Sequence, residues 1–123
     1  MKTSRPIRAR IAPTAILHNY RLAKGLSPQA KAWAVVKANA YGHGAVPVGR
    51  TLAAAGAHGL AVSSLEEGLE LRHGGVSCPI LVLGGLRSEA LPAASAEGLT
   101  IAVVGPEQLA EYAAASPLRA TGR

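Results

Sequence analysis

The 123-residue sequence contains no phenylalanine, one tryptophan and three tyrosines, so aromatic side chains cannot fill its core. Val, Leu, Ile and Ala must do so, which suits the closely packed layers of an α/β fold. The single cysteine, Cys78, excludes an intrachain disulfide. No C-x-x-C motif or His/Cys cluster predicts a metal site. Because Cys78 precedes Pro79 and an apolar run, we expect a buried, unreactive thiol.

Long hydrophobic runs are also missing. No stretch of about 18 apolar residues occurs, so we expect no segment that spans a membrane. The first residues, Met1 to Pro6, lead into no apolar signal core. These features predict a cytoplasmic protein.

Acidic residues are scarce, at 7 Asp and Glu against 13 Lys and Arg, which gives a net charge of +6. No basic block interleaved with aromatics occurs, so we do not expect nucleic-acid binding. We expect most of the basic side chains to lie on solvated faces. The scattered arginines include Arg5, Arg8, Arg10, Arg50, Arg72, Arg119 and Arg123.

The sequence does contain four short apolar runs, at residues 33–36, 59–62, 79–85 and 100–104. Their length and lack of alternation predict strands that are buried on both faces. Segments with helical spacing separate them, which predicts a parallel sheet with helical crossovers. Four such β-α units would make half of an eight-unit barrel. Residues 7–11 instead alternate apolar and charged side chains, which predicts a short N-terminal strand with one solvated face.

Start and stop signals predict the helices between these runs. Pro13 suits a first helical turn, and Lys24-Gly25 suits its end. Ser64 and Glu67 have the spacing of a capping box, and His73 before two glycines suits the end of that helix. Further helices are expected after Gly44, from Ser88 through Leu91 with Pro92 confined to early positions, and after Gly105.

Lys37 ends the first apolar run and precedes the glycine-rich turn Tyr41-Gly42-His43-Gly44. The carboxyl ends of parallel strands are where α/β folds place their chemistry. A lysine amine there can bond covalently to an aldehyde such as that of pyridoxal phosphate, and can serve as a base. The alternative interpretation is a lysine that extends its ammonium group from the strand end into solvent.

The ten-residue string from Val35 to Gly44, VVKANAYGHG, closely resembles the cofactor-lysine signature of the bacterial alanine racemases. The resemblance implies a (β/α)₈ TIM barrel followed by a β domain, in a homodimer. It also implies an isomerase that depends on pyridoxal 5'-phosphate and interconverts L- and D-alanine, which supplies D-alanine for the cell wall.

The same resemblance implies site residues. Lys37 would form the Schiff base with the cofactor and exchange the substrate α-proton on one face, and Tyr41 would contact the cofactor phosphate. Leu81 and Leu83 would point into the barrel mouth and line the cofactor pocket, although both also fit an ordinary core. The strand at residues 7–11 would join the C-terminal domain.

The resemblance covers about residues 5–115 but only the first part of the family's length. We therefore expect residues 1–115 to be the N-terminal portion of a barrel domain, and residues 116–123 to be a polar tail where the chain is truncated. The family's substrate-binding arginine, the rest of its phosphate site and its opposing tyrosine base have no matching positions. The chain would then be inactive alone; the alternative is a non-catalytic cofactor-binding remnant or a nonfunctional truncated product.

Overall fold

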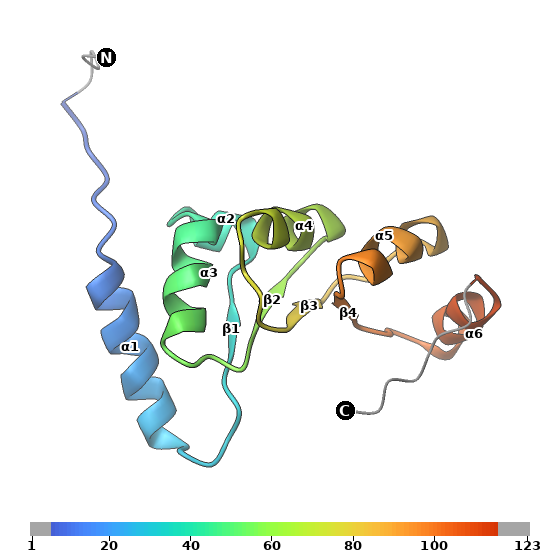
Figure 1. Ribbon diagram of the computed structural model, residues 1–123, viewed down its shortest axis with the longest axis horizontal. Coiled ribbons are helices and arrows are strands. Elements are labelled where there is room, and N and C mark those ends of the chain that lie inside the picture. Colours follow the sequence, from blue (N-terminus) through green and yellow to red (C-terminus); the bar gives the residue numbers. More distant parts are fainter. Residues whose placement is uncertain (1–5, 116–123) are drawn as a thin grey trace.

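The computed structural model describes residues 6–115, in which helices and strands alternate and follow one another across the molecule from α1 to α6 (Figure 1). The strands are β1 (Trp33–Val35), β2 (Gly59–Val62), β3 (Ile80–Val82) and β4 (Thr100–Ile101). The helices are α1 (Pro13–Leu26), α2 (Lys37–Tyr41), α3 (Ala45–Ala54), α4 (Leu65–His73), α5 (Leu91–Ala96) and α6 (Pro106–Ala115), with a 3₁₀ turn, η1 (Ser88–Ala90).

The described strands form one parallel sheet in the order β1-β2-β3-β4. The strands follow one another in the sheet in the same order as in the sequence, so each helical crossover connects a strand to its next neighbour on the same side. A doubly wound sheet would instead reverse its strand order at a switch point. The arrangement is an arc of β-α units, which confirms the predicted α/β architecture with four units.

One face of the sheet carries the core. Pairing of Leu60 with Ile80 and of Val62 with Val82 places these four side chains on the same face, and all are fully buried. They pack with apolar residues of the helices. The helical members of this cluster include Val48, Leu52, Leu71 and Ala94. Burial of these aliphatic side chains supplies the main stabilisation, since no phenylalanine is present.

The opposite face is open, and here the prediction of strands buried on both faces is wrong for β1 and for β4, where Thr100 is exposed. Trp33 is 38% exposed and Val35 is 44% exposed. The register aligns Val35 with Ala61, and Ala61 with Leu81, so these side chains share this face. β1 lies at an edge of the sheet, and no described helix covers this side of it. Below, "the open face" means the face that carries Trp33, Val35 and Leu81.

The predicted N-terminal strand is not formed, because residues 7–11 have no partner strand within residues 6–115. Ile7 is 84% exposed. α1 begins at Pro13 as predicted but continues through Gly25 to Leu26. Lys24 donates from Nζ to the carbonyl oxygens of Pro28 (2.8 Å) and Ala30, which ties the segment after the helix to its last turn.

The fourth strand is shorter than predicted. It ends at Ile101, although Ala102 N still donates to Val82 O at 3.0 Å. Val104 then donates its N–H to Gln108 Oε1 (2.8 Å) at the start of α6 instead of to a neighbouring strand. The strand predicted from the apolar residues 100–104 was therefore too long.

The predicted capping box is confirmed at the start of α4. Ser64 Oγ accepts a hydrogen bond from Glu67 N (3.3 Å), and Glu67 Oε2 accepts one from Ser64 N (3.3 Å). Ser88 begins only the turn η1, after which α5 begins with Pro92 in its first turn. Pro92 is thus confined to an early position, as predicted, because it lacks an N–H.

Arg72 is an exception to the expectation that most basic side chains lie on solvated faces. Its guanidinium donates to four backbone carbonyls and joins the segments that lead into β3 and β4. The acceptors are Glu97 O (2.8 Å), Val76 O (2.8 Å), Cys78 O (2.7 Å) and Gly98 O (3.2 Å). Arginine suits this role because its five N–H groups point in fixed directions.

Cys78 is half-buried and packs against the core. Burial raises the pKa of its thiol, although the positive charge of Arg72 opposes the shift. The thiol is therefore protonated at neutral pH, which supports the expectation of an unreactive side chain.

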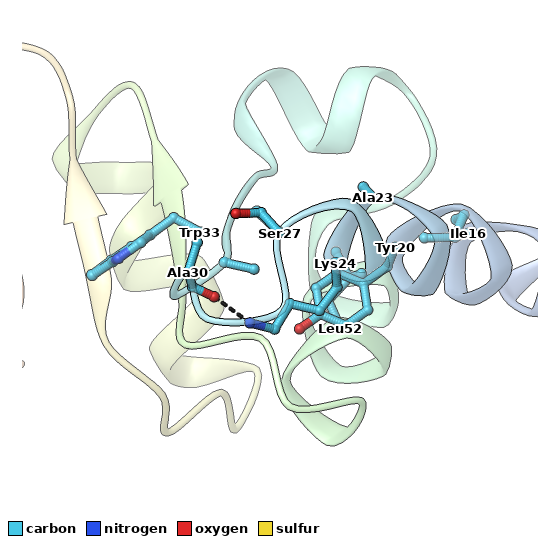
Figure 2. A pocket seen from close by; sticks show the side chains of 10 residues that line it. Ile16, Tyr20, Ala23, Lys24, Ser27, Ala30, Trp33 and Leu52 are labelled. Carbon is cyan, nitrogen blue, oxygen red and sulfur yellow. Dashed lines mark hydrogen bonds between the residues drawn. The ribbon is translucent and has the colours of Figure 1, made fainter.

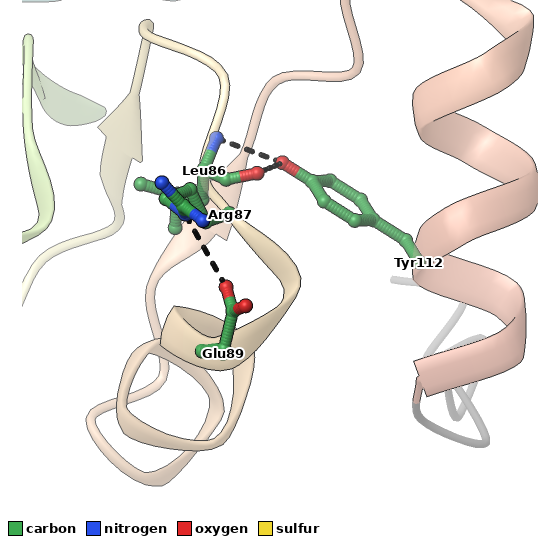
Figure 3. A network of polar contacts seen from close by, with 4 residues as sticks. All are labelled: Leu86, Arg87, Glu89 and Tyr112. Carbon is green, nitrogen blue, oxygen red and sulfur yellow. Dashed lines mark hydrogen bonds and ion pairs between the residues drawn. The ribbon is translucent and has the colours of Figure 1, made fainter.

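Tyr112 fastens α6 to the loop that follows β3. Its ring is 1% exposed, and its hydroxyl both accepts from Leu86 N (2.8 Å) and donates to Leu86 O (2.7 Å), as Figure 3 shows. Arg87 and Glu89 form an exposed ion pair in the same loop (Figure 3). Tyr112 thereby fixes the course of the chain beyond the carboxyl end of β3.

Candidate functional site

Lys37 directly follows Val36 at the carboxyl end of β1. Because the strands are parallel, the turn after β2 and the loop after β3 begin at the same edge of the sheet. Its side chain is half-buried. Val36 is 2% exposed and donates its N–H to Ala61 O (2.9 Å), so the sheet fixes the backbone up to the residue before Lys37.

The segment after Lys37 is a left-handed turn. Ala38, Asn39, Ala40 and Tyr41 have φ values of 51° to 54°. Left-handed helical backbone costs L-residues about 1–2 kcal/mol each, and such strain persists only where surrounding contacts enforce it. Gly42 (φ 86°) and Gly44 (φ 94°) then adopt positive φ at little cost. The sequence predicted a turn only from Tyr41, because nothing in Ala-Asn-Ala signals left-handed backbone.

Local hydrogen bonds close this turn. Ala40 N donates to Val36 O (2.9 Å), and Gly44 N donates to Asn39 O (2.9 Å). The Asn39 side chain accepts from Ala45 N through Oδ1 (2.8 Å), which satisfies an N–H in the first turn of α3. His43 Nδ1 lies 2.9 Å from Ala40 O, so it donates there when it carries the proton. The turn is thus joined to both β1 and α3.

Glu67 joins the turn to the neighbouring strand end. Its Oε1 accepts from Ala38 N (2.7 Å), and its Oε2 accepts from Ser63 N (2.6 Å). Partial burial alone would raise the pKa of Glu67, but the N–H groups of Ala38, Ser63 and Ser64, together with the charge of Lys37, lower it overall. The ionised carboxylate therefore stabilises the fold at neutral pH, and this contribution is lost as the pH falls through the lowered pKa.

The other predicted site residues lie on two elements. Tyr41 is 59% exposed and belongs to the same turn as Lys37, so its ring is free to turn toward a ligand. Leu81 is half-buried on the open face of β3, and Leu83, which is 41% exposed, follows β3. β1 and β3 are separated by β2, so these two strands lie about 10 Å apart.

A cavity of about 390 Å³ lies at the other end of β1, between α1 and Trp33 (Figure 2). Its lining includes Tyr20, Lys24 and Leu52 but not Lys37. The Lys24 ammonium is already bonded to backbone carbonyls, so it is not the reactive amine of a cofactor site. A smaller cavity of about 180 Å³ is lined in part by Val35, Tyr41 and His43, beside the left-handed turn.

Two further features bear on the kind of site. Within residues 6–115, no group of three or more His, Cys, Asp or Glu side chains is placed to hold a metal ion. In the same part of the chain, no helix combines the length and apolarity needed to cross a membrane.

Comparison with known proteins gives one family. Residues 11–121 match the family described as "Alanine racemase, N-terminal domain". Alanine racemase of Symbiobacterium thermophilum is 46% identical over 103 residues, which cover 84% of this chain and 27% of that protein.

Solved structures agree. The biosynthetic alanine racemase of Pseudomonas aeruginosa superposes with a TM-score of 0.80 at 43% identity, over 86% of this chain and 30% of that one. A histidine racemase of Leuconostoc mesenteroides gives a TM-score of 0.77 at 31% identity, over 85% and 28%. This chain thus spans less than a third of the length of each of these relatives. It belongs to the alanine racemase family, and its four β-α units correspond to the N-terminal part of that family's TIM barrel.

Proposed function

We propose that Lys37 binds pyridoxal 5'-phosphate covalently and that the chain is the lysine-bearing part of a racemase acting on alanine. The observation that carries the proposal is the position of Lys37, at the carboxyl end of β1 and directly before a strained turn tied to two strand ends. Backbone strain concentrates at functional sites. Membership of the alanine racemase family supports the choice of cofactor.

Each residue has a role in this proposal. When bound, the cofactor draws electrons away from the α-carbon of an amino acid. Lys37 would hold the cofactor through its amine, and once the amino group of the substrate has displaced that amine, the freed amine would move the α-proton on one face. The Tyr41 hydroxyl would donate to the phosphate, and Leu81 and Leu83 would present apolar surface to the ring. The half-buried amine, the exposed Tyr41 ring and the open apolar face fit a flat aromatic group with an anionic arm.

The substrate and assembly are part of the proposal. Alanine is the favoured substrate because the relatives from Symbiobacterium and Pseudomonas are alanine racemases, whereas the Leuconostoc relative is a histidine racemase. A complete enzyme would act as a homodimer in the cytoplasm and supply D-alanine for the cell wall. Chromatography of the product formed from L-alanine or L-histidine by a protein completed with the remaining domains distinguishes the two substrates.

We expect Lys37 to be the only lysine that pyridoxal phosphate labels specifically. Lys24 has two of its three N–H donors bonded to backbone carbonyls, and Lys31 is exposed in a connecting segment. The adduct is reduced with borohydride and located by peptide mass spectrometry. Lys37→Ala should remove the specific label, and Lys31→Ala should leave it unchanged. Labelling spread evenly over the lysines, or its persistence in Lys37→Ala, would contradict the proposal.

We further expect the 123-residue chain alone not to racemise alanine measurably. Racemisation by two bases needs one on each face of the α-carbon, and the proposal assigns only Lys37. A positioned acid or base contributes about 10²–10⁴-fold. Chiral chromatography after incubation with L-alanine and cofactor measures turnover. Turnover abolished by Lys37→Ala would show that this chain suffices, while absence of both turnover and labelling would favour a nonfunctional product.

A further inference from the structure

We propose that Glu67 is a positioning residue for Lys37, because its carboxylate fastens the first peptide N–H after Lys37 to the turn that follows β2. The inference rests on the proposed function of Lys37. It assigns to Glu67 a task beyond capping α4, and the evidence is the set of atoms that its two oxygens contact.

The capping box explains only one part of these contacts. A capping-box glutamate accepts from the backbone N–H of the N-cap residue, here Ser64, at 3.3 Å. Glu67 makes two shorter bonds in addition, to Ser63 N at 2.6 Å and to Ala38 N at 2.7 Å. Among the described residues, Oε1 accepts a hydrogen bond only from Ala38 N, and Ala38 lies 29 positions before Glu67 in the chain. The carboxylate therefore bridges two strand ends.

The N–H group that Glu67 binds belongs to Ala38, where the backbone changes from negative to positive φ. Val36 has ordinary φ (−126°), whereas Ala38 has φ 51°. Within the turn, Ala40 N is the first N–H to find an acceptor in the preceding backbone, at Val36 O. Glu67 supplies an acceptor to Ala38, which the turn itself does not satisfy. Loss of this acceptor would favour a relaxed backbone at Ala38, and that change would redirect the adjoining Lys37 side chain.

A carboxylate suits this position better than an amide. Both Glu67 oxygens face backbone N–H groups, so a glutamine would have to turn its NH₂ group toward one of them. Hydrogen bonds from N–H to an ionised acceptor are roughly twice as strong as neutral ones. The positive charge of Lys37 also favours the ionised form of Glu67, in addition to the N–H donors.

Three variants separate positioning from helix stability. Glu67→Gln removes one of the two acceptors that reach outside the capping box. Glu66→Gln changes the same charge at the neighbouring exposed position in the first turn of α4. Ser64→Ala removes the side-chain cap on Glu67 N but leaves both outer bonds of the carboxylate in place.

The first readout does not depend on the cofactor. We expect Glu67→Gln to accelerate amide hydrogen exchange about tenfold or more at whichever of Ala38 and Ser63 faces the new NH₂ group, since that hydrogen bond is lost, and less at the other, whose acceptor becomes neutral. Glu66→Gln should leave both rates unchanged. Ser64→Ala should accelerate exchange in α4 and leave Ala38 protected. Unchanged protection of both Ala38 and Ser63 in Glu67→Gln would overturn the proposal.

The second readout is the initial rate at which pyridoxal phosphate forms a borohydride-reducible adduct at Lys37, measured with saturating cofactor on each folded variant. Glu67→Gln should slow it about tenfold, whereas Ser64→Ala and Glu66→Gln should match the parent chain. If the parent chain forms no adduct, the proposed function fails while the exchange result still decides the role of Glu67 in the turn. Equal adduct rates in all folded chains, with a labelled parent, would overturn positioning alone.

Discussion

Arg72→Ala is expected to lower the free energy of unfolding by about 3 kcal/mol, which is a large part of the roughly 5–15 kcal/mol typical of a domain. The guanidinium joins carbonyls of residues 76, 78, 97 and 98, so it holds together the segments that precede β3 and β4. Alanine would leave these acceptors to water. The bonds lie at the amino ends of the strands, so the loss should affect stability rather than the surroundings of Lys37.

Two further variants make this expectation specific. Arg50→Ala removes the same charge, but Arg50 makes one exposed bond, from Nε to Gly74 O (2.6 Å), and should cost about 1 kcal/mol or less. Arg72→Lys keeps the charge but cannot reach four carbonyls with one ammonium, so it should recover less than half of the loss. Urea unfolding measures all three. Equal losses at Arg50 and Arg72, or full recovery with lysine, would refute the bridging role.

Features set by local sequence were predictable. β2 has the predicted bounds, and the capping box of Ser64 and Glu67 forms because its partners lie three residues apart. The place of Lys37 after β1 also follows from a local pattern, an apolar run followed by glycines. In each case, neighbours along the chain supply the interactions that decide the structure.

Features that depend on distant contacts were not predictable. The left-handed turn is bonded to Glu67, which lies 29 residues beyond Ala38. Arg72 looked like one of many surface charges, because its acceptors at residues 97 and 98 come together only in the folded chain. Val35 is exposed because, within residues 6–115, no other element packs over β1 at this edge of the sheet. The apolar sequence of β1 gives no sign of that exposure.

We expect the isolated 123-residue chain to associate rather than remain a well-ordered monomer. Within residues 6–115, β1 and β4 each pair on one side only, so their outer edges present free N–H and C=O groups. Unprotected edges of apolar strands promote pairing with other chains. The open face adds exposed apolar side chains at Trp33 and Val35 of β1, and Leu83 after β3 is also exposed.

Exposure of apolar surface on the open face is unfavourable in water, and association would bury that surface. At about 25 cal/mol per Å², covering roughly 300 Å² of apolar surface would contribute about 7 kcal/mol, which is comparable to the stability of a whole domain. Light scattering over a dilution series should therefore show dimers or larger species. Val35→Thr on the open face should weaken this association, whereas Val36→Thr on the buried face should mainly reduce stability. A monomer that persists at all concentrations, with sharp and dispersed NMR signals, would show that the edges and the open face are tolerated in water.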